Sequence, residues 1–111
     1  MFSNPQKRGD AQTQELRREA GLWLRQLREA RGLSQRQLAQ LVEVDYYPFI
    51  SQLETGRGRI PAEKYRLWAD ALGIPVRDFV SHLLQFYDPI THEILFEPAK
   101  LCRTRSRGRA D

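Results

Sequence analysis

The sequence predicts an all-α protein, a compact bundle of five helices formed by about residues 13 to 86 of its 111. Three observations support this prediction. Apolar residues recur at three- and four-residue steps, which is the period of an amphipathic helix. Glycines follow these periodic segments, as residues that end helices do. Two of the predicted helices are too short to be stable alone, so they must be packed against the others.

The first helix is predicted from about Thr13 to Arg31, and Gly32 ends it. Its apolar stripe consists of Leu16, Ala20, Trp23, Leu24 and Leu27. Residues 1–12 are polar and contain Pro5 and Gly9, so we expect a disordered N-terminus.

A second, short helix follows Ser34. Ser34 and Gln37 have the spacing of a capping box, in which the hydroxyl and the amide each bond a backbone N–H of the first turn. After the turn, a third helix is predicted from Tyr47 to Thr55, with Pro48 in its first turn, where a missing N–H costs nothing. Its inner face carries Ile50 and Leu53. Its outer face is a polar stripe made of Pro48, Ser51, Gln52 and Thr55.

Two further helices complete the predicted domain of residues 13–86. One opens at Pro61 and ends at Gly73, and the other runs from Val76 to Phe86. Trp23 and Trp68 lie on apolar stripes and are predicted core residues. Residues 87–97 form an apolar extension, in which residues 93–96 could be a strand or a helical turn. Residues 98–111 are predicted to be a basic disordered tail.

The net charge of +4 comes from the tail. The last fourteen residues hold five of the 18 basic and one of the 14 acidic residues, which leaves 13 of each in the remainder. An anion-binding surface on the folded body must therefore come from the arrangement of its charges.

Several classes of protein are excluded by composition. No apolar run approaches the ~20 residues of a membrane span, and the N-terminus lacks the apolar region of an export signal. The single Cys102 cannot form an internal disulfide, which fits a cytoplasmic location. His82, His92 and Cys102 lack the spacing of a metal site, and no catalytic triad or carboxylate pair stands out. We expect no metal, no cofactor and no enzymatic activity.

The two short helices joined by a turn indicate a helix-turn-helix reader of DNA. Such a reader needs donors at the start of the second helix, which Gln35 and Arg36 supply. It also needs small or amide side chains on the third helix to meet base edges in a major groove ~12 Å wide. Ser51 and Gln52 meet that demand.

The runs "LSQRQLAQLV", "ISQLETGR" and "ALGI" resemble the Cro/C1-type (XRE) family of helix-turn-helix transcription regulators, which includes the lambdoid phage repressors. The similarity spans roughly Leu22 to Leu84. The resemblance implies a lambda-repressor-like bundle of five helices.

The resemblance also implies roles for individual residues. The residues that match Ser51 and Gln52 face base edges, and the residue that matches Gln35 contacts phosphate. The loop after Gly56 touches the DNA backbone, which gives that role to Arg57 and Arg59. With the neighbouring side chains added, the predicted base contacts are Ser51, Gln52, Tyr47 and Pro48. The predicted phosphate contacts are Gln35, Arg36, Tyr46, Arg57 and Arg59.

Two positions depart from the family pattern. Family members place Gly where Glu43 stands, and the turn here is one residue longer, which we expect to relieve the left-handed geometry that Gly supplies. Pro75 stands where a helix-capping Ser is common.

Several roles stay open at the level of sequence. One of Tyr46 and Tyr47 is expected to pack as a staple across the entry to the third helix, and the other to contact phosphate or a thymine methyl. Gln35 fits a cap as well as a phosphate contact. Glu54 is expected to tie the third helix to a neighbour. The tail fits a solubilising end and a nonspecific DNA contact equally.

The sequence thus predicts a dimeric regulator that binds a palindromic operator in double-stranded DNA, as a repressor, with residues 87–97 in the dimer interface. The same apolar residues could instead cap their own domain. The alternative function is a helix-turn-helix protein-interaction module, such as an antitoxin or accessory factor, with weak or shared DNA binding. A regulatory protein partner is compatible with either function, and RNA binding rests on the tail alone.

Overall fold

The computed structural model describes the backbone of residues 3–96 and the side chains of residues 11–96. The described chain is all helical: α1 (Ser3–Ala30), α2 (Gln35–Leu41), α3 (Pro48–Glu54), the short 3-10 helix η1 (Ala62–Lys64), α4 (Tyr65–Leu72), α5 (Val76–Tyr87) and α6 (Pro89–Phe96). This confirms the predicted all-α class. Within the described part, no helix is both long and apolar enough to cross a membrane.

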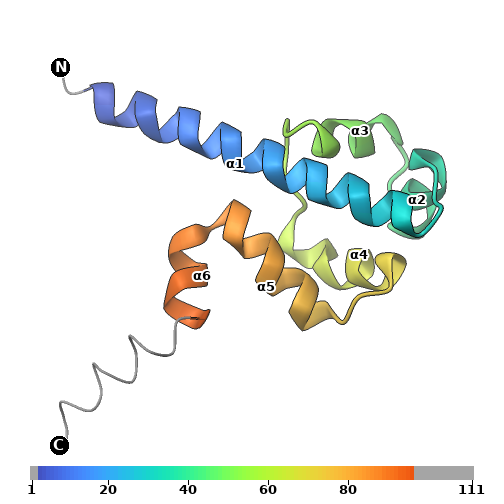
Figure 1. Ribbon diagram of the computed structural model, residues 1–111. Helices are drawn as coiled ribbons and strands as arrows, with labels where there is room; N and C mark the ends of the chain where they lie inside the picture. Colours follow the sequence, from blue (N-terminus) through green and yellow to red (C-terminus); the bar gives the residue numbers. More distant parts are fainter. Residues whose placement is uncertain (1–2, 97–111) are drawn as a thin grey trace, which may run out of the picture.

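The long helix α1 is the centre of the bundle (Figure 1). It packs against α3 on one side and α5 on the other, while α2 contacts α3 and α4, and α4 contacts α5. Side chains from all five of these helices and from the loop after α3 meet in one core. Its largest fully buried members are Trp68, Phe79, Leu24, Leu38, Ile50, Leu53, Ile60, Leu83 and Val42.

Trp68 is buried as predicted, whereas Trp23 is only partly buried. The Trp23 ring stacks on His82 at a centroid distance of 4.2 Å and lies 5.6 Å from Phe79. His82 therefore belongs to an aromatic stack at the edge of the core. No group of three or more His, Cys, Asp or Glu within the described residues could hold a metal ion.

Local signals in the sequence placed the helix-turn-helix correctly. The Gln37 N–H donates to the Ser34 hydroxyl at 3.0 Å, and the Ser34 N–H donates to the Gln37 side-chain oxygen at 2.8 Å, so the capping box is confirmed. Pro48 lies in the first turn of α3 as expected. Ile50 and Leu53 are fully buried and hold α3 on the scaffold.

Three segments differ from the expectations. Residues 3–12, expected to be disordered, continue helix α1, and Pro5 is tolerated because it falls in the first turn, where N–H groups have no partner within the helix. Pro61 lies before the single turn η1, and α4 itself begins at Tyr65. Residues 89–96 form the helix α6, so residues 93–96 take the helical alternative and not the strand, and the helix begins earlier than expected. Asp88 caps α6 by accepting bonds from the Thr91 N–H and hydroxyl. The basic tail and Cys102 lie outside the described residues.

The turn between α2 and α3 contradicts the expectation for Glu43. The longer turn does not relieve the left-handed geometry, because Glu43 has φ of +58°. The Val44 N–H bonds the Ala39 carbonyl at 2.8 Å and the Glu43 N–H bonds the Gln40 carbonyl at 3.2 Å, which is a Schellman cap. This cap requires a left-handed residue whatever the length of the turn that follows, so Glu43 carries backbone strain.

We therefore predict that Glu43→Gly stabilises the protein by about 0.5–1 kcal/mol, the left-handed penalty less the entropy cost of glycine. Urea denaturation should show a higher midpoint with an unchanged slope. The matched control is Glu19→Gly in the middle of α1, which should destabilise by about 1 kcal/mol. A loss of stability in Glu43→Gly would contradict this interpretation of the turn.

Candidate nucleic-acid interface

Helix α3 is anchored to α1 by a buried ion pair. The Arg28 Nε donates to Glu54 Oε2 at 2.6 Å and its Nη2 donates to Oε1 at 3.1 Å, so the fork is bidentate. Only 10% of the Arg28 side chain and 5% of the Glu54 side chain are exposed. The hydrogen bond to Glu54 raises the pKa of Arg28, so the guanidinium stays protonated. Glu54 thus has the tying role that the sequence predicted.

The same carboxylate also reaches α2. The Gln35 amide donates to Glu54 Oε1 at 3.1 Å, and the Arg28 Nη1 donates to the Leu33 carbonyl at 2.8 Å. Three helices and the loop before α2 are therefore joined at one carboxylate. Gln35, the first residue of α2, thus bonds to a side chain within the protein.

A glycine lets α3 approach α1 closely. A Cβ at Gly21 would lie 2.4 Å from the Glu54 carbonyl oxygen and 2.5 Å from that of Leu53, distances that no side chain tolerates. Gly21 is buried in the middle of α1, where glycine lowers helix stability. Its place in the sequence is explained by this close contact.

The polar stripe of α3 faces outward. Ser51 and Gln52 are both partly exposed, and neither side chain bonds another described residue. The Thr55 hydroxyl, one turn further on, donates to the carbonyls of Ser51 and Gln52 at 3.0 and 3.1 Å. A hydroxyl and an amide are thus presented on a rigid surface, as direct readout of base edges requires.

The residues around the entry to α3 form a second group. Tyr46 is 63% exposed and Tyr47 37% exposed. The Arg36 guanidinium lies 4.4 Å from the centre of the Tyr47 ring, and its Nη2 is 3.4 Å from the Tyr47 hydroxyl. Neither tyrosine is the expected staple, because α3 presents the polar Ser51 where the apolar partner of a staple would stand. Tyr47 and Arg36 instead hold each other beside the partly exposed Pro48.

The two arginines after α3 lie in different surroundings. Arg57 is exposed and makes no ion pair within the described residues. Arg59 points toward the rest of the bundle: its guanidinium lies 4.7 Å from the centre of the Tyr87 ring and its Nη2 is 3.4 Å from the Tyr65 hydroxyl. The Ile60 N–H donates to the Tyr87 hydroxyl at 3.1 Å, so the loop is fastened to α5. Burial raises the pKa of Tyr87, although the Ile60 bond and Arg59 oppose the shift.

Sequence reasoning missed two residues that position this site. Gly21 could have been suspected, because an isolated glycine within a helical pattern often marks close backbone contact. Arg28 follows Leu24 by four residues and so lies on the apolar stripe of α1, where a buried charge needs a partner. Glu54 was singled out, but its partner was not.

The geometry defines a helix-turn-helix domain, in which α2 is the first helix of the motif and α3, with its exposed outer face, is the second. Residues 19–83 match the family model described as "Helix-turn-helix domain", and the chain belongs to this family of DNA-binding regulators. The match covers more than half of the chain and confirms the predicted family and fold.

Two solved structures are similar to this chain. One is the restriction-modification controller protein C.AhdI from Aeromonas hydrophila, with 34% identity over 59% of this chain and 96% of that chain and a TM-score of 0.51. The other is the clp gene regulator ClgR from Corynebacterium glutamicum, with 27% identity over 80% of this chain and 88% of that chain and a TM-score of 0.53. No curated protein matches this chain.

We predict that Glu54→Gln destabilises the fold by roughly 3 kcal/mol or more, because it removes the buried counter-charge of Arg28 and leaves only the half-exposed Glu29, 4.0 Å away. Urea denaturation measures the change. The control is Glu15→Gln, which breaks the exposed pair with Arg18 and should cost less than about 1 kcal/mol. Equal effects of the two substitutions would show that the buried fork does not anchor α3.

Proposed function

We propose that this protein is a sequence-specific transcription regulator of the Cro/C1 type that binds a palindromic operator in double-stranded DNA as a homodimer, in the cytoplasm, and acts as a repressor. The proposal rests on one observation: the inner face of α3 is held firmly in the bundle while its outer face is exposed. Its inner face is locked by Ile50, Leu53 and the Glu54 fork, while Ser51 and Gln52 stay partly exposed and unbonded within the described chain. The names of the two similar structures, a controller protein and a gene regulator, support the regulatory class.

The contacts divide into two kinds. Ser51 and Gln52 read base edges, with Tyr47 and Pro48 beside them at the N-terminal end of α3. Arg36, Tyr46 and Arg57 contact phosphates on either side of the groove and set the register. Gln35 contacts Glu54, and Arg59 contacts the Tyr87 ring, so both residues help to position this surface. Each can bind a phosphate only by sharing or giving up that contact.

The dimer interface is assigned to α6 and the groove beside it. Four of the eight large apolar side chains that are exposed in the described chain lie on this one helix, namely Ile90, Ile94, Leu95 and Phe96. Next to it, a groove of about 360 Å³ is lined by Leu16 of α1 and by Phe86 and Ile90, among others. In Figure 1, α6 lies at the opposite end of the bundle from α2. An apolar surface of this kind indicates a protein contact.

The same apolar surface also suits a different protein partner, and it is the observation that favours the alternative function, a protein-interaction module with weak DNA binding. Selection from random duplex DNA separates the two functions. Enrichment of a palindrome supports the regulator, and its half-site spacing reports the dimer geometry. Binding that is salt-sensitive but shows no preferred sequence supports the interaction module.

On the selected duplex, we predict that Gln52→Ala weakens binding by ~1–3 kcal/mol and relaxes the preference at one base pair in each half-site, since one side chain reads one pair. The fold should be unchanged, because the partly exposed amide makes no hydrogen bond to another described residue. Gln26→Ala, which removes an exposed glutamine of α1, is the control. If Gln52→Ala combined with Ser51→Ala leaves affinity and preference intact, the assignment of the reading helix is wrong.

For the interface, we predict that Ile90→Asp combined with Ile94→Asp yields a folded monomer, because these side chains are 70% and 60% exposed and lie one helical turn apart. Light scattering measures the mass, and affinity for a two-half-site duplex should fall on the order of a hundredfold. The control Leu22→Asp replaces an exposed leucine of α1 and should stay dimeric. A dimer that survives both substitutions on α6 would place the interface elsewhere.

A further inference from the structure

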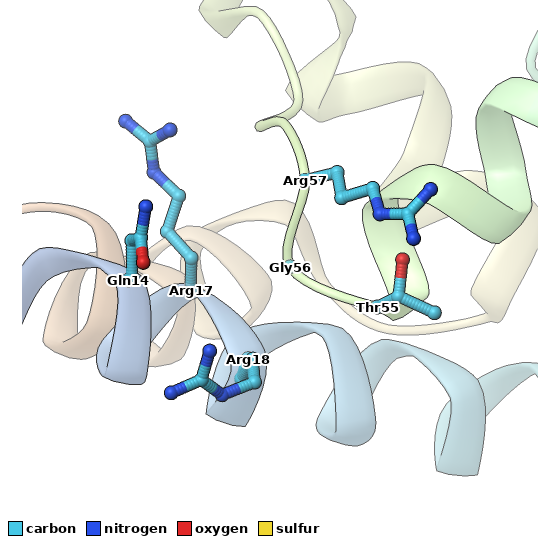
Figure 2. A pocket seen from close by; sticks show the side chains of 6 residues that line it. All are labelled: Gln14, Arg17, Arg18, Thr55, Gly56 and Arg57. Atoms are coloured by element: carbon cyan, nitrogen blue, oxygen red, sulfur yellow. The ribbon is translucent and has the colours of Figure 1, made fainter. Parts of the chain in front are cut away.

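An open cleft of about 410 Å³ lies between α1 and the loop that follows α3. Figure 2 shows the residues that line it: Gln14, Arg17, Arg18, Thr55, Gly56 and Arg57. Three of the six are arginines and none is acidic. Because the charges of residues 1–97 balance, this local excess of positive charge is a product of the fold.

Gly56 allows the two walls of the cleft, α1 and the loop after α3, to approach each other closely. A Cβ on this residue would lie 2.9 Å from the Cα of Arg18, and its φ of +84° is one that other residues rarely adopt. The Gly56 N–H bonds the Leu53 carbonyl at 3.2 Å and the Arg57 N–H bonds the Gln52 carbonyl at 2.8 Å. These bonds fix the loop to the end of α3, and the close contact of Gly56 with Arg18 places it against α1, so Arg57 lines the same cleft as Arg17 and Arg18.

Little in the described chain neutralises these arginines. Arg18 pairs with Glu15 at 2.7 Å, but both side chains are more than half exposed, so the pair is weak and easily exchanged for another anion. Neither Arg17 nor Arg57 makes an ion pair within the described residues. In Figure 2, Arg17 and Arg57 lie on opposite sides of the Gly56 backbone, and their guanidinium groups are separated. Separated cations suit successive phosphates along a strand better than one small anion.

The cleft also continues the reading surface of α3. Thr55 lines the cleft, and it lies four residues after Ser51, on the same face of the helix. A duplex that meets Ser51 and Gln52 therefore brings the edge of its groove toward this end of α3. The part of α1 that carries Gln14, Arg17 and Arg18 lies along that edge.

We propose that Arg17 and Arg18 of α1 form, together with Arg57, a binding site for phosphodiesters of the DNA backbone that border the major groove. Arginine suits this task because its planar donors match phosphate oxygens. This assignment rests on the proposed function and gives the N-terminal half of α1 a part in DNA binding. It adds affinity without sequence information, as phosphate contacts do.

The test compares Arg17→Gln combined with Arg18→Gln against the unaltered protein on the selected duplex over a range of NaCl concentrations. Each lost phosphate contact lowers the slope of log affinity against log salt by about 0.9, so we expect a fall of about one to two with an unchanged base preference. Arg17→Lys combined with Arg18→Lys should restore most of the slope, because lysine also neutralises phosphate. The control Arg77→Ala removes an exposed arginine of α5, across α1 from α3, and should leave the slope unchanged.

The outcomes separate the two proposals. If the unaltered protein selects a palindrome and the glutamine variant keeps its salt slope, the cleft is not a phosphate site, although the regulator function stands. If the unaltered protein binds no duplex, both proposals fail.

A second experiment adds inorganic phosphate alone to the protein and follows the backbone amides of Gly56 and Arg57 by NMR. We expect no saturable change in these amide chemical shifts as the phosphate concentration rises. A saturable change that is absent from the glutamine variant would contradict the proposal and assign the cleft to a free anion. Arg57→Gln gives a second variant for the slope if the double variant is less stable.

Discussion

The surface that we propose to read DNA depends on one buried interaction, the bidentate pair of Arg28 with Glu54. A seven-residue helix such as α3 does not persist alone, so its direction must come from its attachment. Ile50 and Leu53 fix its depth, but apolar contacts are not directional. The fork adds direction at the C-terminal end, and Gly21 allows the backbones to meet there. An ion pair of this kind adds little net stability compared with apolar residues, but breaking it is costly, so it specifies geometry more than it strengthens the fold.

The fork also explains how the two short helices keep their relative orientation. Glu54 accepts from Arg28 of α1 and from Gln35 of α2, and Arg28 donates further to the Leu33 carbonyl before α2. The first turn of α2 and the last turn of α3 thus share one charged centre. On the other side, Arg59 and the Tyr87 hydroxyl fasten the loop after α3 to α5, and α5 leads into α6. The surface proposed to read DNA and the surface proposed to dimerise are consequently built on the same rigid body.

Much of the fold could be predicted because its signals are local. The capping box of Ser34 and Gln37, the place of Pro48 and the glycine stops each involve residues within one helical turn. The Arg28–Glu54 pair joins residues 26 apart, and the cleft joins α1 to a loop nearly 40 residues later, so neither has a local signature. The left-handed Glu43 was missed because the extra residue of the turn was assumed to absorb a constraint that the α2 cap itself imposes. The polar composition of residues 3–12 obscured the extension of α1, which the apolar pattern of a helix could not reveal.

We propose that a duplex meets the outer face of α3, which the buried fork holds in place. Backbone amide NMR during addition of the selected duplex tests it most directly, because each amide reports its own surroundings. We predict that the largest shifts fall on Ser51, Gln52 and Thr55 and on the flanking residues Arg36 and Arg57. The amides of the first turn of α5, on the other side of α1, should stay unchanged. Shifts concentrated on α4 and α5, with α3 unaffected, would contradict it.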